Sequence, residues 1–243
     1  MLSGRRVVIT GAGRGLGRAF AIAAGDAGAE VVLLGRELSG IQAVAGEIEA
    51  RTFRTVAAIH CDLGVPASIG EACSAVIALS PAVDVLINNG APWLAGELQD
   101  LAEADIVTTI AATVTGTLLL TRGLLPALRQ STAADIVTIV STAGMPDRDL
   151  DGASAAFHAA KHAQAGFSNR LARELKGQKI RVSAIFPPDF DDTDPLGAEW
   201  NATRECGPGA RMSNREVVAA IMFAITAPRI CATPIIVLDN MSG

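Results

Sequence analysis

The sequence predicts an α/β fold in which a doubly wound parallel sheet of about seven strands is covered by helices on both faces. Short runs rich in Val, Ile and Leu alternate with longer amphipathic or Ala-rich segments along all 243 residues. The strand-like runs are almost continuously apolar, as strands are when both faces of a sheet are covered. Repeated strand–helix alternation indicates right-handed crossovers, which place the carboxyl ends of the strands, where ligands bind, along one edge.

The same alternation sets the expected order of elements. Strands are expected where β-branched residues and Leu are concentrated, at 5–10, 30–34, 55–59, 83–87, 135–140, 180–185 and 234–238. Helices are expected in the segments between them, at 15–28, 38–52, 66–79, 101–130, 151–177 and 213–227. No repeat, low-complexity tract or linker interrupts this order, so residues 1–243 are expected to form one domain.

One long stretch, roughly residues 187–213, has no regular pattern and is rich in Pro, Gly and Asp. A loop of that length in a compact domain is usually a lid or a binding loop, so we expect it to cover a substrate site. It contains an acidic run, Asp189, Asp191, Asp192 and Asp194. A metal site there is conceivable, but a solvated loop is the favoured interpretation and no metal is expected.

The composition excludes several classes of function. Half of the residues are hydrophobic and only 4% are aromatic, which predicts a core of Ala, Val, Ile and Leu. The net charge of −5 and the scattered basic residues offer no surface for nucleic acid or membrane lipid. No signal peptide and no membrane-spanning stretch are expected. The cysteines have no metal-binding spacing and indicate reduced thiols in a cytoplasmic protein: Cys61, Cys73, Cys206 and Cys231.

A glycine-rich turn follows the first expected strand and opens the first expected helix. Glycines permit a tight turn and close backbone approach, while a helix N-terminus offers free N–H groups and a positive dipole. This order of strand, turn and helix is typical of a Rossmann-type phosphate cradle and is much stronger evidence than glycines alone. The expected cofactor-binding residues of this turn are Gly11, Gly13, Arg14, Gly15, Leu16 and Gly17.

The end of the second strand bears on the choice of cofactor. An acidic residue there would bind a ribose 2′-hydroxyl, whereas an arginine favours a 2′-phosphate. The chain has Arg36 at this place, and Arg14 in the glycine turn adds a second guanidinium. The two arginines favour NADP(H) over NAD(H). In the alternative interpretation both are solvated surface residues, and Glu37 weakens the preference.

Together these motifs resemble the short-chain dehydrogenase/reductase family over essentially the whole chain. Besides the glycine turn, Cys61-Asp62-Leu63 is similar to the element that contacts adenine. Asn88-Asn89-Gly90-Ala91 is similar to the family's Asn-Asn-Ala-Gly element with its last two residues exchanged. Ser141, which closes the fifth strand, resembles the catalytic serine, and Lys161 lies where the family's Tyr-x-x-x-Lys motif has its lysine.

The resemblance implies hydride transfer between NADP(H) and an alcohol or carbonyl. In the family, a tyrosine hydroxyl moves the proton, the lysine binds the nicotinamide ribose and lowers the pKa of the tyrosine, and the serine steadies the substrate oxygen. An asparagine on the preceding long helix holds a water in the proton relay. The resemblance also assigns Asp62, Leu63, Asn89, Gly90, Lys161 and Pro187 to cofactor binding, and it implies a homodimer or homotetramer formed through the helices at 101–130 and 151–177.

The catalytic half of the pattern departs from the family at three places. Phe157 stands at the tyrosine position, and the whole chain contains no tyrosine. Phenylalanine neither donates nor accepts a proton. Thr113 stands at the asparagine position. Pro187-Pro188 replaces the usual Pro-Gly, and the threonine expected further on, Thr193, is displaced by one residue.

The loss of the tyrosine raises the question of another proton source. Spacing of 100° per residue would put Ser154, His158 and Lys161 on one stripe of a helix. His158 titrates near neutrality, so one hypothesis is that it replaces the tyrosine. The favoured alternative is that His158 points toward a neighbouring helix or solvent, because it is offset by one residue from position 157. Ser154 and water are further candidates.

Two functions therefore remain open from the sequence. The first is an NADP(H)-dependent oxidoreductase that acts on a small or medium apolar alcohol or carbonyl with an atypical catalytic centre. The second is a catalytically inactive dinucleotide-binding protein, acting as a sensor or as a partner subunit. The intact glycine turn argues against a fold that binds no cofactor. Trp93 and Trp200 are candidates for lining a substrate site, although single tryptophans more often serve packing.

Overall fold

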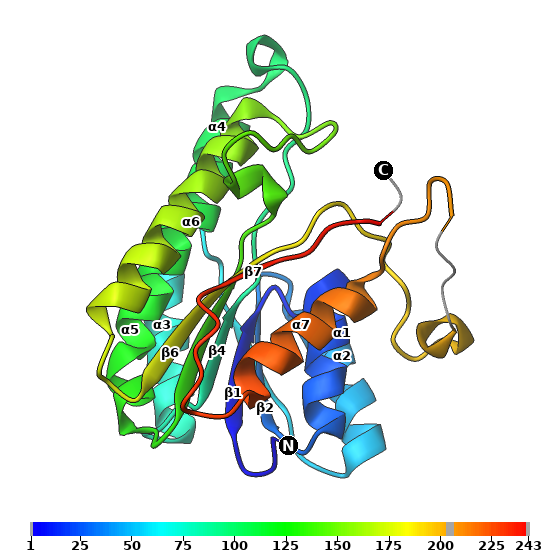
Figure 1. Cartoon of the computed structure of the whole chain (residues 1–243). Helices are drawn as coiled ribbons and strands as arrows, with labels where there is room; N and C mark the ends of the chain where they lie inside the picture. The colour runs from blue at the N-terminus through cyan, green and yellow to red at the C-terminus, as the bar shows by residue number, and fades with distance from the viewer. Residues whose placement is uncertain (1, 203–206, 242–243) are drawn as a thin grey trace.

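The computed structural model describes residues 2–202 and 207–241, which form one α/β domain around a seven-stranded parallel sheet. The strand order is β3-β2-β1-β4-β5-β6-β7 (Figure 1). The strands are β1 Arg6–Thr10, β2 Glu30–Gly35, β3 Ala57–His60, β4 Val85–Asn88, β5 Ala134–Ile139, β6 Ile180–Phe186 and β7 Ile235–Val237. All seven expected strands are confirmed, with ends that move by at most a few residues.

The order of the strands reverses between β1 and β4, which makes this place the topological switch point of the sheet. The chain adds β2 and β3 on one side of β1 and then returns to place β4 on the other side. Val7 of β1 is paired with Val31 of β2 and with Val85 of β4, so β1 joins the two halves of the sheet. In parallel sheets the crevice beyond the strand ends at such a switch point is the usual place of a ligand.

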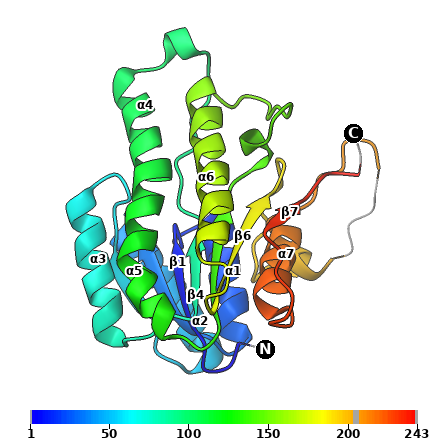
Figure 2. The ribbon, with the colours of Figure 1, turned by 60° about the vertical axis from the view of Figure 1, so that its left-hand side comes forward.

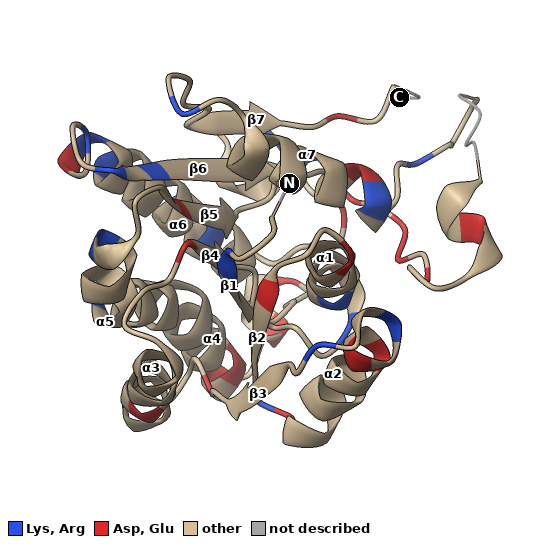
Figure 3. Cartoon of the chain, turned by 90° about the horizontal axis from the view of Figure 1, so that it is seen from below, with Lys and Arg blue, Asp and Glu red and all other residues tan. Residues whose placement is uncertain are grey.

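Helices cover both faces of the sheet. They are α1 Gly15–Asp26, α2 Leu38–Thr52, α3 Pro66–Leu79, α4 Glu103–Ile110, α5 Thr117–Gln130, α6 Ala155–Glu174 and α7 Asn214–Thr226. Short helical turns are η1 Leu98–Asp100, η3 Thr142–Gly144 and η4 Ala198–Asn201. Viewed along the sheet in Figure 3, α1, α2 and α7 lie on one face, and α3, α5 and α6 lie on the other.

Alternate residues of each central strand enter two separate cores. Val7 and Ile9 pack toward α1, α2 and α7, whereas Val8 packs toward α3 and α5. In β4 the residues Ile87 and Leu86 divide in the same way. Because successive side chains of a strand point to opposite faces, continuous apolar runs are needed to fill both cores. The continuous runs in the sequence therefore predicted the layering correctly.

The helix expected at 101–130 is continuous from Glu103 to Gln130, but a π-helical segment, η2 Ala111–Gly116, separates α4 from α5. By length and composition this helix would suffice to cross a membrane, contrary to the expectation that no apolar stretch is long enough. One third of its most apolar window is buried in the fold. α5 packs against α3, β4 and β5, as the core helix of a layered domain does.

The helix expected at 151–177 begins later than predicted, because Ser154 is its N-cap. Ser154 Oγ accepts the backbone N–H of Phe157 at 3.2 Å, and the first helical residue is Ala155. At the other end, Gly177 has a positive φ of 86° just beyond the helix. The prediction that Ser154 belongs to the helical stripe with Lys161 was therefore wrong, since a hydroxyl that caps the helix lies outside its regular turns.

The segment expected as a lid, 187–213, is described except for residues 203–206, where the expected thiol of Cys206 also falls. Its first part runs along the carboxyl edge of the sheet beside α1 (Figure 1). An isolated bridge pairs Asp191 with Ser213, which is the N-cap of α7. The beginning and the end of the segment are therefore tied together next to the glycine turn.

Candidate functional site

The glycine turn closes directly onto the loop after β4. Gly11 has a positive φ of 64°, and a Cβ at this residue would lie 2.8 Å from the Cα of Gly90. A Cβ at Gly17 would collide with the carbonyl oxygen of Gly11. These contacts explain why the turn needs glycine: the backbone of α1 and the backbone of the 89–90 loop both approach it too closely for a side chain.

Thr10 and Asn89 fasten this crevice with hydrogen bonds. Thr10 Oγ1 accepts the backbone N–H of Asn89 at 2.9 Å and that of Gly90 at 2.8 Å. The side-chain amide of Asn89 donates to the carbonyl oxygens of Thr10 and Gly11, at 3.0 and 3.3 Å. Asn89 was predicted to bind the cofactor, and in the structure its amide holds the turn that would receive it.

The N-terminus of α1 has no capping side chain. Its N-cap is the exposed Arg14 in an extended conformation, and no acidic residue occurs in its first turn. Free N–H groups and the positive end of the helix dipole are thus available at Gly15, Leu16 and Gly17. A Cβ at Gly13 would make only an ordinary contact with the start of α2, 3.5 Å from the carbonyl carbon of Gly40.

A carboxylate from the 187–213 segment lies over this helix end. A Cβ at Gly15 would be 3.1 Å from Oδ2 of Asp192. The amide of Asn214 donates to the other carboxylate oxygen of Asp192 at 3.4 Å. Asp192 immediately precedes Thr193, which is buried and has its backbone N–H and C=O bound by Asn214. Sequence analysis singled out Thr193 for this region, whereas the structure brings Asp192 to the glycine turn.

The other carboxylates of the acidic run are paired. Asp194 accepts from Arg18 of α1 at 2.8 Å, and this contact lowers the pKa of Asp194. Arg211 pairs with Asp189 and, at 3.4 Å, with Asp191. The side chains of these three aspartates are exposed, in agreement with the favoured interpretation of a solvated loop, and their ion pairs also tie the segment to α1 and to Arg211. Within residues 2–202 and 207–241, no group of three His, Cys, Asp or Glu side chains is arranged to hold a metal.

The predicted adenine side of the site lies at the ends of β2 and β3. The Arg36 side chain is 66% exposed, and its nearest charge is Glu37 at 3.6 Å, so its guanidinium is available to a ligand. Asp62 Oδ1 accepts the N–H of Gly64 at 2.8 Å, which shapes the turn after β3. The side chain of the next residue, Leu63, would be 2.9 Å from a Cβ at Gly90, so the β3 and β4 loops also meet here.

Ser141 occupies a strained position between β5 and η3. Its φ of 115° and ψ of 154° lie in a region that only glycine normally adopts. Its Oγ accepts the N–H of Ala143 at 3.2 Å, which leaves the hydroxyl proton to donate elsewhere. The adjacent N–H of Thr142 donates to the carbonyl oxygen of Pro187, so the β5 and β6 ends are joined beside this serine.

Phe157 is buried beneath an aromatic contact. Its ring centroid lies 4.8 Å from that of Trp93 in an edge-to-face arrangement, and only 5% of Phe157 is exposed. Trp93 itself is 54% exposed, so its ring covers Phe157 on the side that faces solvent. The Nζ of Lys161 lies 5.5 Å from the Phe157 centroid, within the range of a cation–π contact.

Lys161 is anchored inside the protein. Its Nζ donates to the carbonyl oxygen of Ile139 at 3.0 Å and to Oε1 of Gln164 at 3.1 Å. The amide nitrogen of Gln164 donates in turn to the carbonyl oxygen of Thr113 at 2.9 Å and to Oγ1 of Thr117 at 3.1 Å. Burial lowers the pKa of Lys161 to about 7.

Thr113, at the predicted asparagine position, lies in the π-helical segment. The wider i→i+5 turns of such a segment leave carbonyl groups free for side chains, and π segments often occur at functional sites. The carbonyl oxygen of Thr113 accepts from Gln164 and from Thr117, while its own Oγ1 is buried without a hydrogen-bond partner. An orphaned buried hydroxyl is compatible with the predicted role of holding a water.

His158 is directed away from Lys161. Its Nε2 lies 3.4 Å from a carboxylate oxygen of the exposed Asp149, in the loop that precedes α6. The favoured alternative was that the one-residue offset turns His158 toward a neighbouring helix or solvent, and the ring in fact approaches an exposed loop residue. Among the described residues, the groups brought together with Phe157 are Trp93, Lys161 and, through Lys161, Gln164 and Thr113.

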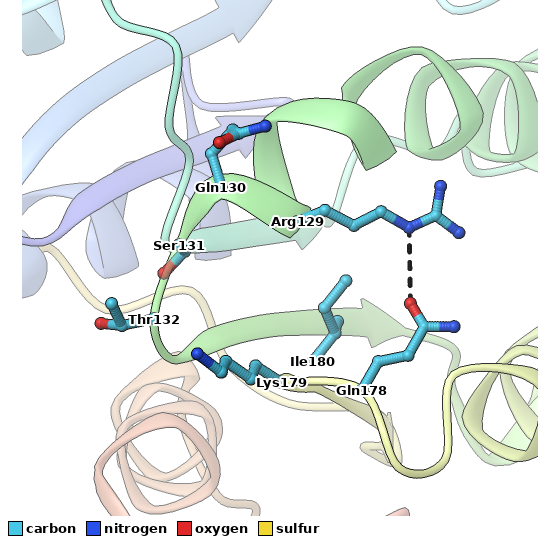
Figure 4. A pocket seen from close by; sticks show the side chains of 7 residues that line it. All are labelled: Arg129, Gln130, Ser131, Thr132, Gln178, Lys179 and Ile180. Carbon is cyan, nitrogen blue, oxygen red and sulfur yellow. Dashed lines mark hydrogen bonds between the residues drawn. The ribbon is translucent and has the colours of Figure 1, made fainter.

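A separate hollow lies at the opposite edge of the sheet. It has a volume of about 260 Å³ and is lined by residues 129–132 and 178–180, with Arg129 hydrogen-bonded to Gln178 (Figure 4). These residues adjoin the amino-terminal ends of β5 and β6, whereas the glycine turn and Ser141 lie at the carboxyl ends. We place the functional site at the switch point, because the backbone cradle and the buried lysine are there.

The residues present fit a dinucleotide. A side chain added to the glycine turn would clash with backbone, α1 presents free N–H groups, and a guanidinium is available at the end of β2. Sequence reasoning missed Gln164 and the position of Asp192. A glutamine three residues after Lys161 in an Ala-rich helix was the available signal for the first, and nothing local signalled the second.

The comparisons with known proteins agree with this geometry. The sequence profile described as short chain dehydrogenase matches residues 5–204. An uncharacterized short-chain type dehydrogenase/reductase of Sinorhizobium fredii is 30% identical, with 93% of this chain and 92% of that protein covered. An uncharacterized oxidoreductase of Staphylococcus aureus strain MRSA252 is 24% identical, with 94% of each chain covered.

Solved structures share the fold along nearly the whole chain. A metagenomic short-chain oxidoreductase in complex with NADP superposes with a TM-score of 0.80 at 27% identity, covering 98% of this chain and 97% of that one. A short-chain type dehydrogenase/reductase from Mycobacterium marinum gives a TM-score of 0.84 at 24% identity, covering 98% and 95%. The glycine turn, the switch-point crevice and the matched length agree with one another, and the chain belongs to the short-chain dehydrogenase family.

Proposed function

We propose that the protein is an NADP(H)-dependent oxidoreductase that interconverts a small or medium apolar alcohol and the corresponding carbonyl through an atypical catalytic centre. The observation that carries the proposal is the glycine turn locked against Gly90, with Ser141 just after β5. At the same end of β5, the carbonyl oxygen of Ile139 accepts from Nζ of Lys161, which comes from α6. The exposed ring of Trp93 over Phe157 supports an apolar substrate.

Each part of the site has a task in this reaction. The bound nicotinamide supplies or accepts a hydride. The N–H groups at the start of α1 bind phosphate, and Arg36 with Arg14 binds the 2′-phosphate. The hydroxyl of Ser141 donates to the substrate oxygen and orients it. Lys161 places positive charge beside the same region, and Phe157 with Trp93 excludes water from it.

The preference for NADP(H) over NAD(H) rests on the guanidinium at the end of β2. Arg36 is two-thirds exposed and only loosely paired with Glu37, so a 2′-phosphate can bind it bidentately. The metagenomic relative in complex with NADP points the same way.

The direct test is a titration of the purified protein with NADPH and with NADH, followed by fluorescence, and then by absorbance on addition of a panel of carbonyls. We expect tighter binding of NADPH and consumption of the cofactor with at least one apolar carbonyl. An Arg36→Ala variant should lose most of the difference between the two cofactors. Failure of either cofactor to bind would refute the proposal.

A second candidate function is that of a dinucleotide-binding protein without turnover, a sensor or partner subunit. The residue at the tyrosine position favours it, since a buried phenylalanine cannot transfer a proton. Stoichiometric NADPH binding with no oxidation by any carbonyl in the panel would support this candidate over the first.

Replacement of Phe157 by tyrosine separates the two candidates further. In an intact pocket the added hydroxyl would lie near Nζ of Lys161, which is 5.5 Å from the present ring centre. We expect the Phe157→Tyr variant to reduce carbonyls about a hundredfold faster than wild type, the usual size of a general-acid contribution. The single-turnover rate of NADPH oxidation measures this directly, and Phe157→Leu is the matched control.

We also propose that the protein acts in the cytoplasm as a homodimer or homotetramer, with no nucleic-acid or membrane partner. Exposed apolar side chains on the long helix, Val107 at 66% and Leu118 at 37% exposure, support pairing of the helices between copies. Sedimentation equilibrium of wild type and of a Val107→Glu, Leu118→Glu variant tests the assembly.

A further inference from the structure

A single buried amide fixes the position of the Lys161 ammonium. Gln164 is 1% exposed and follows Lys161 by three residues on α6, so both side chains leave the same face of the helix. Its Oε1 accepts from Nζ of Lys161 at 3.1 Å, and its Nε2 donates to two oxygens of the neighbouring helix, those of Thr113 and Thr117. Figure 2 shows α6 alongside the long helix that carries these two threonines.

The orientation of this amide is dictated by its partners. An ammonium group only donates, so the oxygen of Gln164 must face Lys161. The carbonyl of Thr113 only accepts, so the nitrogen must face Thr113. All three hydrogen-bonding groups of the amide are satisfied, and a rotation by 180° would break each bond. Gln164 therefore acts as a rigid clamp between the π-helical segment and Lys161.

The clamp leaves one proton of Lys161 unassigned. An ammonium has three N–H donors, and two are bound by the carbonyl of Ile139 and by Gln164. Among the residues that the structure describes, no other hydrogen-bond acceptor contacts Nζ, which faces the Phe157 ring at 5.5 Å. The third donor is thus held beside the place where a tyrosine hydroxyl would lie.

The side chains of the other candidates for the proton source lie near other groups. Ser154 Oγ caps α6, and His158 is directed to Asp149. The hydroxyls of Ser141 and Thr113 do not titrate near neutral pH. Lys161 is an ionisable group that lies against the ring of Phe157, and it is deprotonated far more readily than an exposed lysine because it is buried.

We propose that Lys161, positioned by Gln164, is the acid and base of this site in place of the missing tyrosine. The inference rests on the proposed oxidoreductase function. In carbonyl reduction, hydride reaches the carbonyl carbon while Nζ gives a proton to the oxygen, directly or through one water. The alcohol and a neutral amine result, and the amine regains its proton from solvent. Alcohol oxidation runs the same transfers in reverse.

The charge state of Lys161 is set by uncharged surroundings. Burial is the cause of its lowered pKa, and no charged side chain contributes to the shift. On α6, His158 contacts Asp149 and His162 is exposed with its ring bonded to a backbone carbonyl. In the elements packed on α6, the charged residues are exposed or paired: Glu103 and Asp105 of α4 are exposed, and Arg181 of β6 pairs with Asp135 of β5.

The test is the pH dependence of both reaction directions. If Lys161 is the acid, reduction falls as pH rises through its pKa and oxidation rises through the same pKa, because the two directions need opposite protonation states. If the lysine only binds the cofactor, the rates of reduction and oxidation should change with pH in the same sense. Rates extrapolated to saturating cofactor and substrate remove the contribution of binding.

Variants of the clamp should move that pKa without removing the lysine. Gln164→Glu places a carboxylate against the ammonium, so both limbs should move to higher pH by about one unit or more. Gln164→Met keeps the size and removes the acceptor, so both limbs should move to lower pH. Gln130→Glu, an exposed amide to carboxylate change on α5, is the matched control and should leave the limbs in place.

A titration that needs no turnover accompanies the kinetics. The ¹³Cε signal of Lys161 in ¹³C-lysine-labelled protein is identified by its loss in Lys161→Met, and its pKa is measured in wild type and in the two clamp variants. We expect the ordering Gln164→Glu above wild type above Gln164→Met. An unchanged pKa in both variants would overturn the role of Gln164.

The remaining outcomes separate the inference from the proposed function. Movement of the Lys161 pKa without movement of the kinetic limbs would show that Lys161 is not the acid. If no carbonyl or alcohol is turned over, both the oxidoreductase function and the acid role of Lys161 are refuted. The titration of Lys161 would still decide whether Gln164 positions the lysine. Cofactor oxidation by Lys161→Met at the wild-type rate would also overturn the acid role.

Discussion

At the scale of single residues, the site is defined by groups held in costly states. Ser141 adopts a backbone conformation normal only for glycine, and Lys161 keeps an amine in an apolar interior. Backbone strain of this kind costs about 1–3 kcal/mol and persists where surrounding structure enforces it. Phe157, in contrast, is an ordinary buried aromatic residue. Strain and desolvation are therefore retained at this site although the tyrosine is absent.

The strain at Ser141 predicts an unusual stability difference. Ser141→Gly and Ser141→Ala both remove the hydroxyl, but only glycine relieves the φ of 115°. We expect the glycine variant to be more stable than the alanine variant by about 1 kcal/mol after its larger backbone entropy is subtracted. Urea unfolding of the pair measures the difference, and an alanine variant that is equally or more stable would contradict the strain.

The burial of Lys161 predicts a stability that depends on pH. The folded protein releases this proton at about 7, whereas the unfolded chain keeps it up to the ordinary value of 10.5. Between these values the unfolded state binds more protons, so the free energy of unfolding gains up to about 1.4 kcal/mol per pH unit from this group as pH rises. The Lys161→Met variant should lack that gain, so its stability relative to wild type should decrease from pH 7 to pH 10. Parallel stability curves for the two proteins would refute the lowered pKa.

At the scale of elements, the segment after β6 lies against the glycine turn. Asp192 lies over the start of α1, and Arg18 binds Asp194 a short distance along the same segment. A negative charge at the positive end of α1 stabilises the protein without ligand. The same charge repels a bound pyrophosphate, so nucleotide binding requires the segment to shift or to accept repulsion.

This arrangement predicts that Asp192 weakens cofactor binding. The Asp192→Asn variant should bind NADPH about tenfold more tightly than wild type, equivalent to about 1.4 kcal/mol, because the amide removes the charge and keeps the size. Isothermal titration calorimetry at low ionic strength measures the two dissociation constants. Asp239→Asn removes a charge from an exposed pair with Arg148 and serves as the control that should not change affinity. Equal or weaker binding by Asp192→Asn would exclude this role.

At the scale of the whole molecule, one buried carboxylate ties distant parts of the chain together. Asp135, at the start of β5, pairs with Arg5 at 2.6 Å, Arg181 at 2.7 Å and Arg229 at 2.9 Å, and only 3% of its side chain is exposed. The partners come from before β1, from β6 and from the segment after α7. The amino-terminal edge of the sheet, opposite the functional site, is thereby fixed to both ends of the fold.

The cluster predicts a large loss of stability on removal of its only carboxylate. In Asp135→Asn, three guanidiniums would face one another without a counter-charge, and we expect a loss of about 3 kcal/mol or more in the free energy of unfolding. Asp26→Asn breaks the exposed pair with Arg51 and should cost less than about 1 kcal/mol. Denaturant midpoints of the two variants compare these costs, and similar midpoints would show that the cluster contributes little.

The sequence by itself determined the architecture and the glycine turn. Strands and helices were predicted within a few residues because each apolar run must fill cores on both faces of one sheet. The glycine turn was predicted because positive φ and close backbone contacts demand glycine at particular positions. This requirement is local, so it can be recognised directly in the sequence.

Only the tertiary structure decided which side chains meet around Phe157 and Lys161. The start of α6 at Ala155 made Ser154 a cap, and the helix then faces Lys161 and Gln164 inward while His158 meets Asp149. Asp192 reached the glycine turn because a long irregular segment folds back on α1. The face of α6 that is buried and the path of the 187–213 segment both depend on contacts between residues far apart in the chain. The sequence therefore shows which side chains are present, and packing determines which of them meet.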